Sequence, residues 1–182
     1  MLIRIQDLEV QELVFQEEFR PGTIDLGSEL TQQAPLKASG RAELLEEHHG
    51  RKAPIQDIRI VGRYATRIGS RCARCLEPVE YPLAGDFDLL YRPTGSDFRA
   101  PEVSISQAET EIGYYRGDGL LLEDVLREQI LLALPARSMC SDGCKGLCPR
   151  CGRNLNLEPC DCPEPPPDTR WAALEEIRRK LE

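Results

Sequence analysis

The chain has 182 residues, of which 41% are hydrophobic and 5% aromatic, and it carries a formal net charge of −8 at pH 7. This length suits one domain with an appendage or two small domains, with a core that is mostly aliphatic. The negative charge argues against a protein that coats nucleic acid by charge alone, because such binding depends on neutralising phosphates.

The N-terminal stretch MLIRIQDLEVQELVFQEEF has acidic residues where an export signal needs an uninterrupted apolar run. Nothing in the sequence approaches the ~18 consecutive apolar residues of a membrane span. We therefore expect a cytoplasmic protein with no membrane partner, in a compartment where disulfides are rare.

The first part of the chain predicts β structure, with alternation in residues 1–5, mixed apolar and polar residues over 36–46, and a turn at 48–50. The clearest strand is Ile55–Arg71, because its apolar residues and its arginines fall on opposite parities, as on a strand with one buried face. The apolar parity carries Ile58, Ile60, Tyr64 and Ile68, and the other carries Arg59, Val61, Arg63, Arg67 and Arg71.

A second strand follows, and its apolar residues again share one parity: Tyr81, Leu83, Phe87, Leu89 and Tyr91. The sequence between the two strands is CARCLEP. We therefore expect a β-hairpin whose turn carries Cys72 and Cys75.

The rest of the chain predicts two helices joined by irregular segments. The polar stretch Arg92–Ile112 is interpreted as a long loop, and Leu120–Leu134 as one long helix that ends at Pro135. Residues 163–167 (PEPPP) form an extended linker. A final helix is expected over Arg170–Leu181, capped by Asp168, with an apolar stripe that packs on its own domain or docks on a partner protein.

Eight cysteines carry the most specific chemical information: Cys72, Cys75, Cys140, Cys144, Cys148, Cys151, Cys160 and Cys162. Two pairs have CxxC spacing, which lets one tight turn aim two sulfurs at a single ion. The second of them reads CPRCG, with a proline that shapes the turn and a glycine that permits left-handed backbone geometry.

The cysteines divide into two candidate four-thiolate sites. The local set is Cys148, Cys151, Cys160 and Cys162, which leaves Cys72, Cys75, Cys140 and Cys144 as a set that ties the hairpin turn to the end of the helix. Two alternatives stay open. In one, Cys144 is a ligand of the local site, and in the other, only one of Cys160 and Cys162 is a ligand.

Four protein sulfurs close the coordination shell of zinc, so we expect two structural zinc sites and no catalytic metal. Buried free thiols are the simpler alternative. A second alternative is an iron–sulfur enzyme, since Cys144, Cys148 and Cys151 have CxxxCxxC spacing. That chemistry needs a large barrel around its cofactor, for which the chain offers little room.

The expected architecture is α+β: an antiparallel β-sheet with one long helix, a four-cysteine zinc knuckle and a C-terminal helix. Its expected parts are a β-rich core with the following helix (1–139), a cysteine-rich module (140–162), and a linker with the final helix (163–182). We find no nucleophile elbow, phosphate-binding loop or dinucleotide motif, and the two histidines lie in a polar turn. We therefore expect no enzyme and no small-molecule substrate.

The segment LLLEDVLREQILLALPARSMCSDGCKGLCPRCGRNLNLEPCDC (120–162), together with RCARCLEP (71–78), closely resembles the YceD-like family of bacteria and plastids. DTRWAAL (168–174) is similar to the family's closing segment. One departure is Gly143, which stands where the family has an acidic residue before the cysteine.

The resemblance implies a role in the accumulation of 23S ribosomal RNA (rRNA) in a bacterium, in a family often encoded beside a zinc-containing large-subunit ribosomal protein. It implies no known catalytic activity. Shorter family members lack the CPRCG-to-CDC stretch, which fits a local four-cysteine module separate from the first site.

The charge distribution adds a candidate RNA contact. Residues 51–74 hold seven basic residues against one acidic residue, Asp57. Arg59, Arg63, Arg67 and Arg71 recur every four residues on one strand face, about 13 Å apart, a spacing that could follow a phosphate backbone. Arg74 adds charge beside the cysteine turn.

These four arginines, the arginine stripe, have two possible roles. In the first, the stripe binds 23S rRNA precursor. In the other, Asp86 and Asp88 pair with it across the hairpin, depending on the register. The protein would then be an acidic adaptor that binds a basic large-subunit ribosomal protein, or a nuclease, and affects rRNA indirectly.

Overall fold

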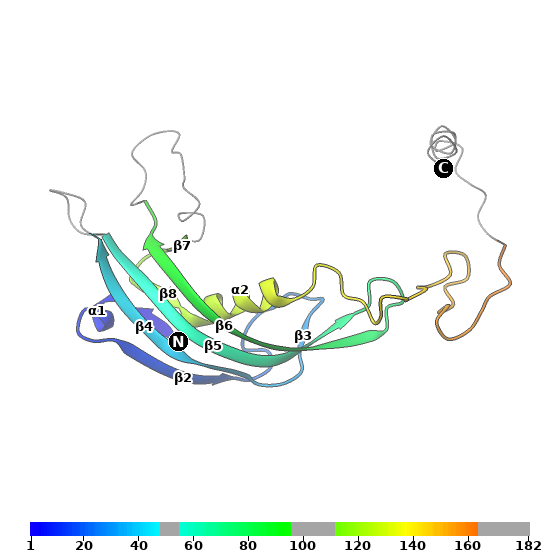
Figure 1. Cartoon of the computed structure of the whole chain (residues 1–182), viewed down its shortest axis with the longest axis horizontal. Coiled ribbons are helices and arrows are strands. Elements are labelled where there is room, and N and C mark those ends of the chain that lie inside the picture. The colour runs from blue at the N-terminus through cyan, green and yellow to red at the C-terminus, as the bar shows by residue number, and fades with distance from the viewer. Residues whose placement is uncertain (48–54, 96–111, 164–182) are drawn as a thin grey trace, which may run out of the picture.

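The computed structural model describes residues 1–47, 55–95 and 112–163 (Figure 1). The elements are β1 (Leu2–Arg4), α1 (Ile5–Leu8), β2 (Leu13–Phe19), β3 (Thr31–Gln32), β4 (Leu36–Glu47), β5 (Ile55–Arg71), β6 (Pro78–Pro93), β7 (Ile112–Tyr115), β8 (Gly119–Leu121) and α2 (Leu122–Ala133). A six-stranded sheet has the order β2-β4-β5-β6-β7, with β3 also paired to β5, and β1 and β8 form a second, two-stranded sheet.

The predicted hairpin is the centre of the large sheet. Strands β5 and β6 pair antiparallel from Ile58↔Tyr91 to Arg71↔Pro78, which places residues 72–77 at its turn. The predicted inward parity of β5 is confirmed, because Ile58, Ile60 and Ile68 are fully buried. The side chains of the arginines on the other parity face the opposite side of the sheet.

The long strands curve, and α2 lies along their concave side (Figure 1). The helix buries Leu122, Val125, Leu126 and Ile130, which join the inward side chains of the sheet in one apolar core. Tyr64 on β5 donates a hydrogen bond from its hydroxyl to the Gln129 carbonyl at 3.2 Å. The sheet and the helix are therefore held by apolar burial together with a specific polar contact.

A row of four residues crosses the concave face of the sheet where two glycines meet. Phe15, Gly40, Gly62 and Phe87 are successive cross-strand partners on β2, β4, β5 and β6. A β-carbon added to Gly62 would lie 2.7 Å from the Phe87 ring. The two buried phenylalanine rings therefore occupy the space that the glycines leave.

The prediction of one long helix over Leu120–Leu134 is wrong. Leu120 and Leu121 lie in β8, where they pair with Ile3 and Leu2 of β1, so that α2 has only 12 residues. The other helix of the described residues, α1, has four. The predicted end at Pro135 is confirmed, because Leu134 is extended (φ −75°, ψ 144°), as a residue before proline prefers.

The sheet is mixed, whereas only antiparallel pairing was expected, since β6 and β7 pair in parallel. The ends of the predicted loop Arg92–Ile112 belong to these strands, with Arg92 and Pro93 in β6 and Ile112 in β7. The turn at 48–50, residues 96–111 of that loop and the helix over Arg170–Leu181 lie outside the described residues. No helix within the described residues has the length and apolarity that a membrane crossing requires.

We predict that Gly40→Ala destabilises the fold, because the new β-carbon would lie 2.2 Å from the Val61 carbonyl oxygen and 2.8 Å from the Phe15 ring. The expected loss in unfolding free energy is about 1–3 kcal/mol, as for overpacked cores, measured by urea denaturation. Gly143→Ala is the matched control, since no heavy atom lies within 4 Å of its added β-carbon. Equal stabilities for the two variants would contradict the prediction.

Candidate metal centres

The first cysteine cluster joins the hairpin turn to the chain that follows α2. Its members are Cys72, Cys75, Cys140 and Cys144, whose sulfurs all lie within 4.8 Å of one another. The Sγ–Sγ distance is 3.8 Å between Cys72 and Cys144 and 3.6 Å between Cys75 and Cys140. Four sulfurs at about 2.3 Å from a tetrahedral zinc ion would be separated by about 3.8 Å, so this donor set fits zinc.

Main-chain hydrogen bonds hold these two segments together beside the sulfurs. Ala73 donates its amide to the Ser138 carbonyl at 2.8 Å, and Leu147 donates to the Arg74 carbonyl at 3.1 Å. The Arg74 guanidinium donates to the Cys144 carbonyl at 2.9 Å. The cluster therefore joins chain segments about 70 residues apart, as the sequence predicted.

The second cluster is local. Cys148, Cys151, Cys160 and Cys162 also place all four sulfurs within 4.8 Å of one another, so the structure groups the eight cysteines into the two predicted sets. Cys144 lies with the first set, and both Cys160 and Cys162 lie with the second.

The two CxxC turns share one backbone design. In each, the amide of the first cysteine donates to the carbonyl five residues later, and the amide four residues later donates back to the first cysteine. The distances are 2.8 Å (Cys72 to Glu77) and 2.9 Å (Leu76 to Cys72) in the hairpin, and 2.8 Å (Cys148 to Arg153) and 2.9 Å (Gly152 to Cys148) in the second cluster. Leu76 (φ 62°) and Gly152 (φ 72°) take the left-handed conformation that closes each turn.

These turns favour thiolates. Amides of Cys75, Arg74 and Cys140 lower the pKa of Cys72 to about 6. Amides of Cys151 and Arg150 do the same for Cys148, lowering its pKa to about 6. Because the thiolate is the metal ligand, each cluster has at least one sulfur prepared to bind at neutral pH.

One sulfur of the second cluster, that of Cys162, resists ionisation while no cation lies among the four. Hydrogen bonding with the Cys151 side chain and desolvation raise the pKa of Cys162 to about 12. A divalent cation would reverse this effect, because it attracts every thiolate around it. The donor set is therefore one whose full deprotonation depends on metal binding.

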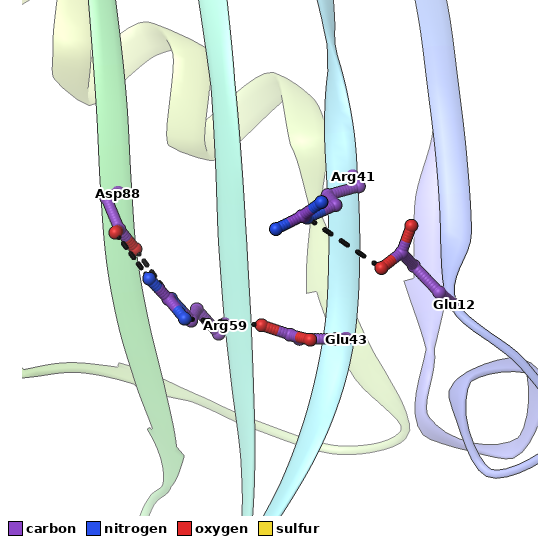
Figure 2. Close-up of polar contacts among 5 residues, drawn as sticks. All are labelled: Glu12, Arg41, Glu43, Arg59 and Asp88. Carbon is purple, nitrogen blue, oxygen red and sulfur yellow. Dashed lines mark hydrogen bonds and ion pairs between the residues drawn. The ribbon is translucent and has the colours of Figure 1, made fainter.

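Arg59, the first member of the arginine stripe, is paired on both sides (Figure 2). It contacts Asp88 on β6 at 2.7 Å and Glu43 on β4 at 3.4 Å. Nearby, Arg41 lies 3.7 Å from Glu12. This part of the convex face is therefore mixed in charge.

Arg63 and Arg67, the next two members of the stripe, differ in their polar partners. Arg63 lies opposite Asp86 and donates to the Ser39 hydroxyl at 3.3 Å. Arg67 lies opposite Pro82 and forms a long ion pair, 3.9 Å, with Glu80. The acids of β6 thus lie beside the stripe, and Asp88, which is opposite Val61 in the register, reaches Arg59 diagonally.

Arg71 and Arg74 lie exposed at the hairpin turn, beside the first cluster. Arg74 uses part of its guanidinium to hold the Cys144 carbonyl. The contact of these arginines with RNA stays a prediction.

Asn156 is a site residue that the sequence analysis missed. Its side-chain NH2 donates to the Cys144 sulfur at 3.3 Å. The only signal in the sequence was the NLN string at 154–156 between Cys151 and Cys160, and nothing in that string reveals a contact with the other cluster.

Comparison with known proteins gives one curated protein whose name states a role. This relative is "Large ribosomal RNA subunit accumulation protein YCED homolog 1, chloroplastic" of Arabidopsis thaliana, 32% identical over 57 residues, which are 31% of this chain and 18% of the plant protein. No solved structure matches the chain.

Two mycobacterial relatives match over more of the chain. An uncharacterized protein of Mycobacterium tuberculosis is 31% identical over 124 residues, and one of Mycobacterium leprae is 25% identical over 144 residues. These alignments cover 67% and 79% of this chain, but only 56% and 59% of the relatives, so the chain spans little more than half their length.

A family model, "Large ribosomal RNA subunit accumulation protein YceD", matches residues 60–178. The match includes most of the β5–β6 hairpin, α2 and all eight cysteines. The chain therefore belongs to the family of large ribosomal RNA subunit accumulation protein YceD.

Proposed function

We propose that this protein is a cytoplasmic, non-catalytic ribosome-biogenesis factor that supports the accumulation of 23S rRNA and binds its precursor. The observation that carries the proposal is the family match over residues 60–178, which includes both cysteine clusters. The two clusters hold structural zinc ions, and the curved sheet supplies the binding surface.

The assignment of zinc rests on the donors and their geometry. Four thiolates with sulfur separations of 3.6 and 3.8 Å suit a tetrahedral ion. Such a shell leaves no open position for a substrate or a reactive water molecule, which supports a structural role and a protein that is not an enzyme. Zinc in the first cluster would hold the hairpin turn against the segment that follows α2.

Direct RNA contact is supported by the exposed arginines toward the hairpin turn. Arg63 and Arg71 form no ion pair within the described residues, and Arg67 has only a long one. Three guanidinium groups at four-residue steps on one strand face could contact successive phosphates. We therefore assign the main RNA contact to Arg63, Arg67 and Arg71.

A second candidate function is favoured by the ion pairs on the same face. Glu43 and Asp88 share Arg59, and the chain as a whole has a net charge of −8. An acidic surface suits a basic protein partner, such as a large-subunit ribosomal protein. In this case the factor would act on rRNA indirectly.

Metal removal tests the zinc assignment. We predict that a strong zinc chelator increases amide hydrogen exchange in residues 72–77 and 139–162, because the apolar contacts there are few and centre on the sulfurs. The inward-facing parts of β4, β5 and α2 are expected to keep their protection, because they lie in the main core. Readdition of zinc should restore the pattern. Unchanged exchange in a sample shown to be metal-free would contradict the assignment.

Charge removal on the stripe tests RNA binding. We predict that the triple variant Arg63→Ser, Arg67→Ser, Arg71→Ser loses most ultraviolet crosslinking to 23S precursor in cells, read by sequencing the bound RNA. The matched control is Arg4→Ser, Arg20→Ser, Arg116→Ser, which removes three other exposed positive charges and should keep crosslinking. Equal crosslinking by both folded variants would exclude the stripe. If ribosomal proteins co-purify with the wild-type chain and no RNA is enriched, the adaptor function is correct.

A further inference from the structure

The two cysteine clusters differ in their exposure to solvent. Three residues of the first cluster are buried, and only Cys140 is exposed, whereas in the second only Cys148 is buried and Cys151 is exposed. The first cluster is also backed by Val79, Met139 and Leu147. The second cluster is therefore the more accessible to competing ligands from solution.

The loop of the second cluster reaches the first cluster through Asn156. Its Nδ2 lies 3.3 Å from the Cys144 sulfur, and its Oδ1 accepts the Lys145 amide at 2.7 Å. Because only the oxygen can accept from a backbone N–H, the orientation of this side-chain amide is fixed by its partners. The NH2 group is thus directed at the sulfur and stabilises a thiolate there.

Asn154 links the same loop to the other half of the first cluster. Its Oδ1 accepts from the Asn156 amide and from the Asn156 side chain at 3.0 and 2.8 Å, and its Nδ2 donates to the Glu77 carboxylate at 3.2 Å. The carbonyl of Glu77 accepts the amide of Cys72. A hydrogen bond from Leu155 to Gly146 at 2.9 Å completes the contact.

We propose that the two metal centres form a coupled pair, in which Asn156 is the positioning residue that makes metal binding at the first centre depend on the state of the second. This inference rests on the proposed metal binding. Metal at Cys148, Cys151, Cys160 and Cys162 closes the loop that carries Asn154 and Asn156 and holds it against Cys144. When the second centre is empty, the loop loses that closure, and the first centre loses a hydrogen bond to its sulfur.

The size of the effect follows from the role of groups that orient metal ligands. Loss of such a partner typically weakens metal binding by 10–100-fold. Emptying the second centre should therefore weaken the first by a factor in this range, and it should do so through Asn156.

The test is a titration of the full chain with cobalt(II) under anaerobic, reducing conditions, followed by competition with zinc. Absorption bands of tetrahedral cobalt–thiolate sites report metal binding without any functional assay. The variant Cys160→Ser, Cys162→Ser disables the second centre, so its remaining bands report the first. We expect its first centre to bind cobalt about 10–100-fold more weakly than in the wild type.

Asn156→Ala should weaken the first centre by a similar factor while the second centre still binds. Leu157→Ala is the matched control, because Leu157 lies in the same loop with 74% of its surface exposed. In the triple variant Asn156→Ala, Cys160→Ser, Cys162→Ser, the two losses should not add, since both act through one hydrogen bond. Circular dichroism of each variant establishes that the sheet is folded.

Three results would overturn the coupling: a Cys160→Ser, Cys162→Ser variant whose first centre keeps the wild-type affinity, an Asn156→Ala variant whose first centre keeps it, or fully additive losses in the triple variant. Failure of the metal assignment would be distinguishable from failure of the coupling, because the wild-type chain would then bind neither cobalt nor zinc. Failure of the rRNA function would leave all of these metal affinities unchanged.

Discussion

The far end of the β5–β6 hairpin needs a source of stability that the main core does not provide. The apolar core extends along the hairpin to Ile68, and α2 ends at Ala133, before the chain reaches the turn. At the turn, the buried cluster consists of Cys72, Cys75 and Cys144 with a few apolar neighbours. Convergence of four sulfurs is therefore the constraint on which the geometry of this end depends. It also decides where the segment after α2 lies, because Cys140 and Cys144 must reach the same point.

The sequence predicted the elements whose pattern is local. The parity of Ile58, Ile60 and Ile68 identified β5, and proline at 135 ended α2 as expected. The short pairing of β1 with β8 was missed, because three-residue strands have no measurable period and join positions about 120 residues apart. Leu120 and Leu121 therefore looked like the first turn of a helix. The parallel pairing of β7 was missed for a related reason, since its contact with β6 is long-range.

The candidate site shows the same division between local and long-range information. The CxxC spacings predicted one pair of ligands in each set, because each turn brings two sulfurs together without help from the rest of the fold. The other pairs were assigned because Cys148, Cys151, Cys160 and Cys162 are close in sequence, which left Cys140 and Cys144 for the first set. The ion-pair partners of the arginines could not be assigned, since they depend on strand register. Asn156 was beyond prediction, because its contact with Cys144 requires the second loop to fold back over the first cluster. The division into 1–139, 140–162 and 163–182 stays a prediction, although Cys140 and Cys144 lie with the hairpin turn.

The ion pairs on the convex face do not by themselves exclude RNA from it. The side chains of Arg59 and Asp88 are 41% and 54% exposed, and such surface pairs contribute only about 0–1 kcal/mol. A phosphate could replace a carboxylate beside Arg59 at little cost, provided that the displaced carboxylate is solvated. The Asp57–Arg92 pair is different, because both side chains are at most 10% exposed and their bidentate contact spans β5 and β6. An exchange of partners there would require burying an uncompensated carboxylate, which costs several kcal/mol. RNA binding on this face is therefore compatible with the exposed ion pairs and should leave the buried pair intact.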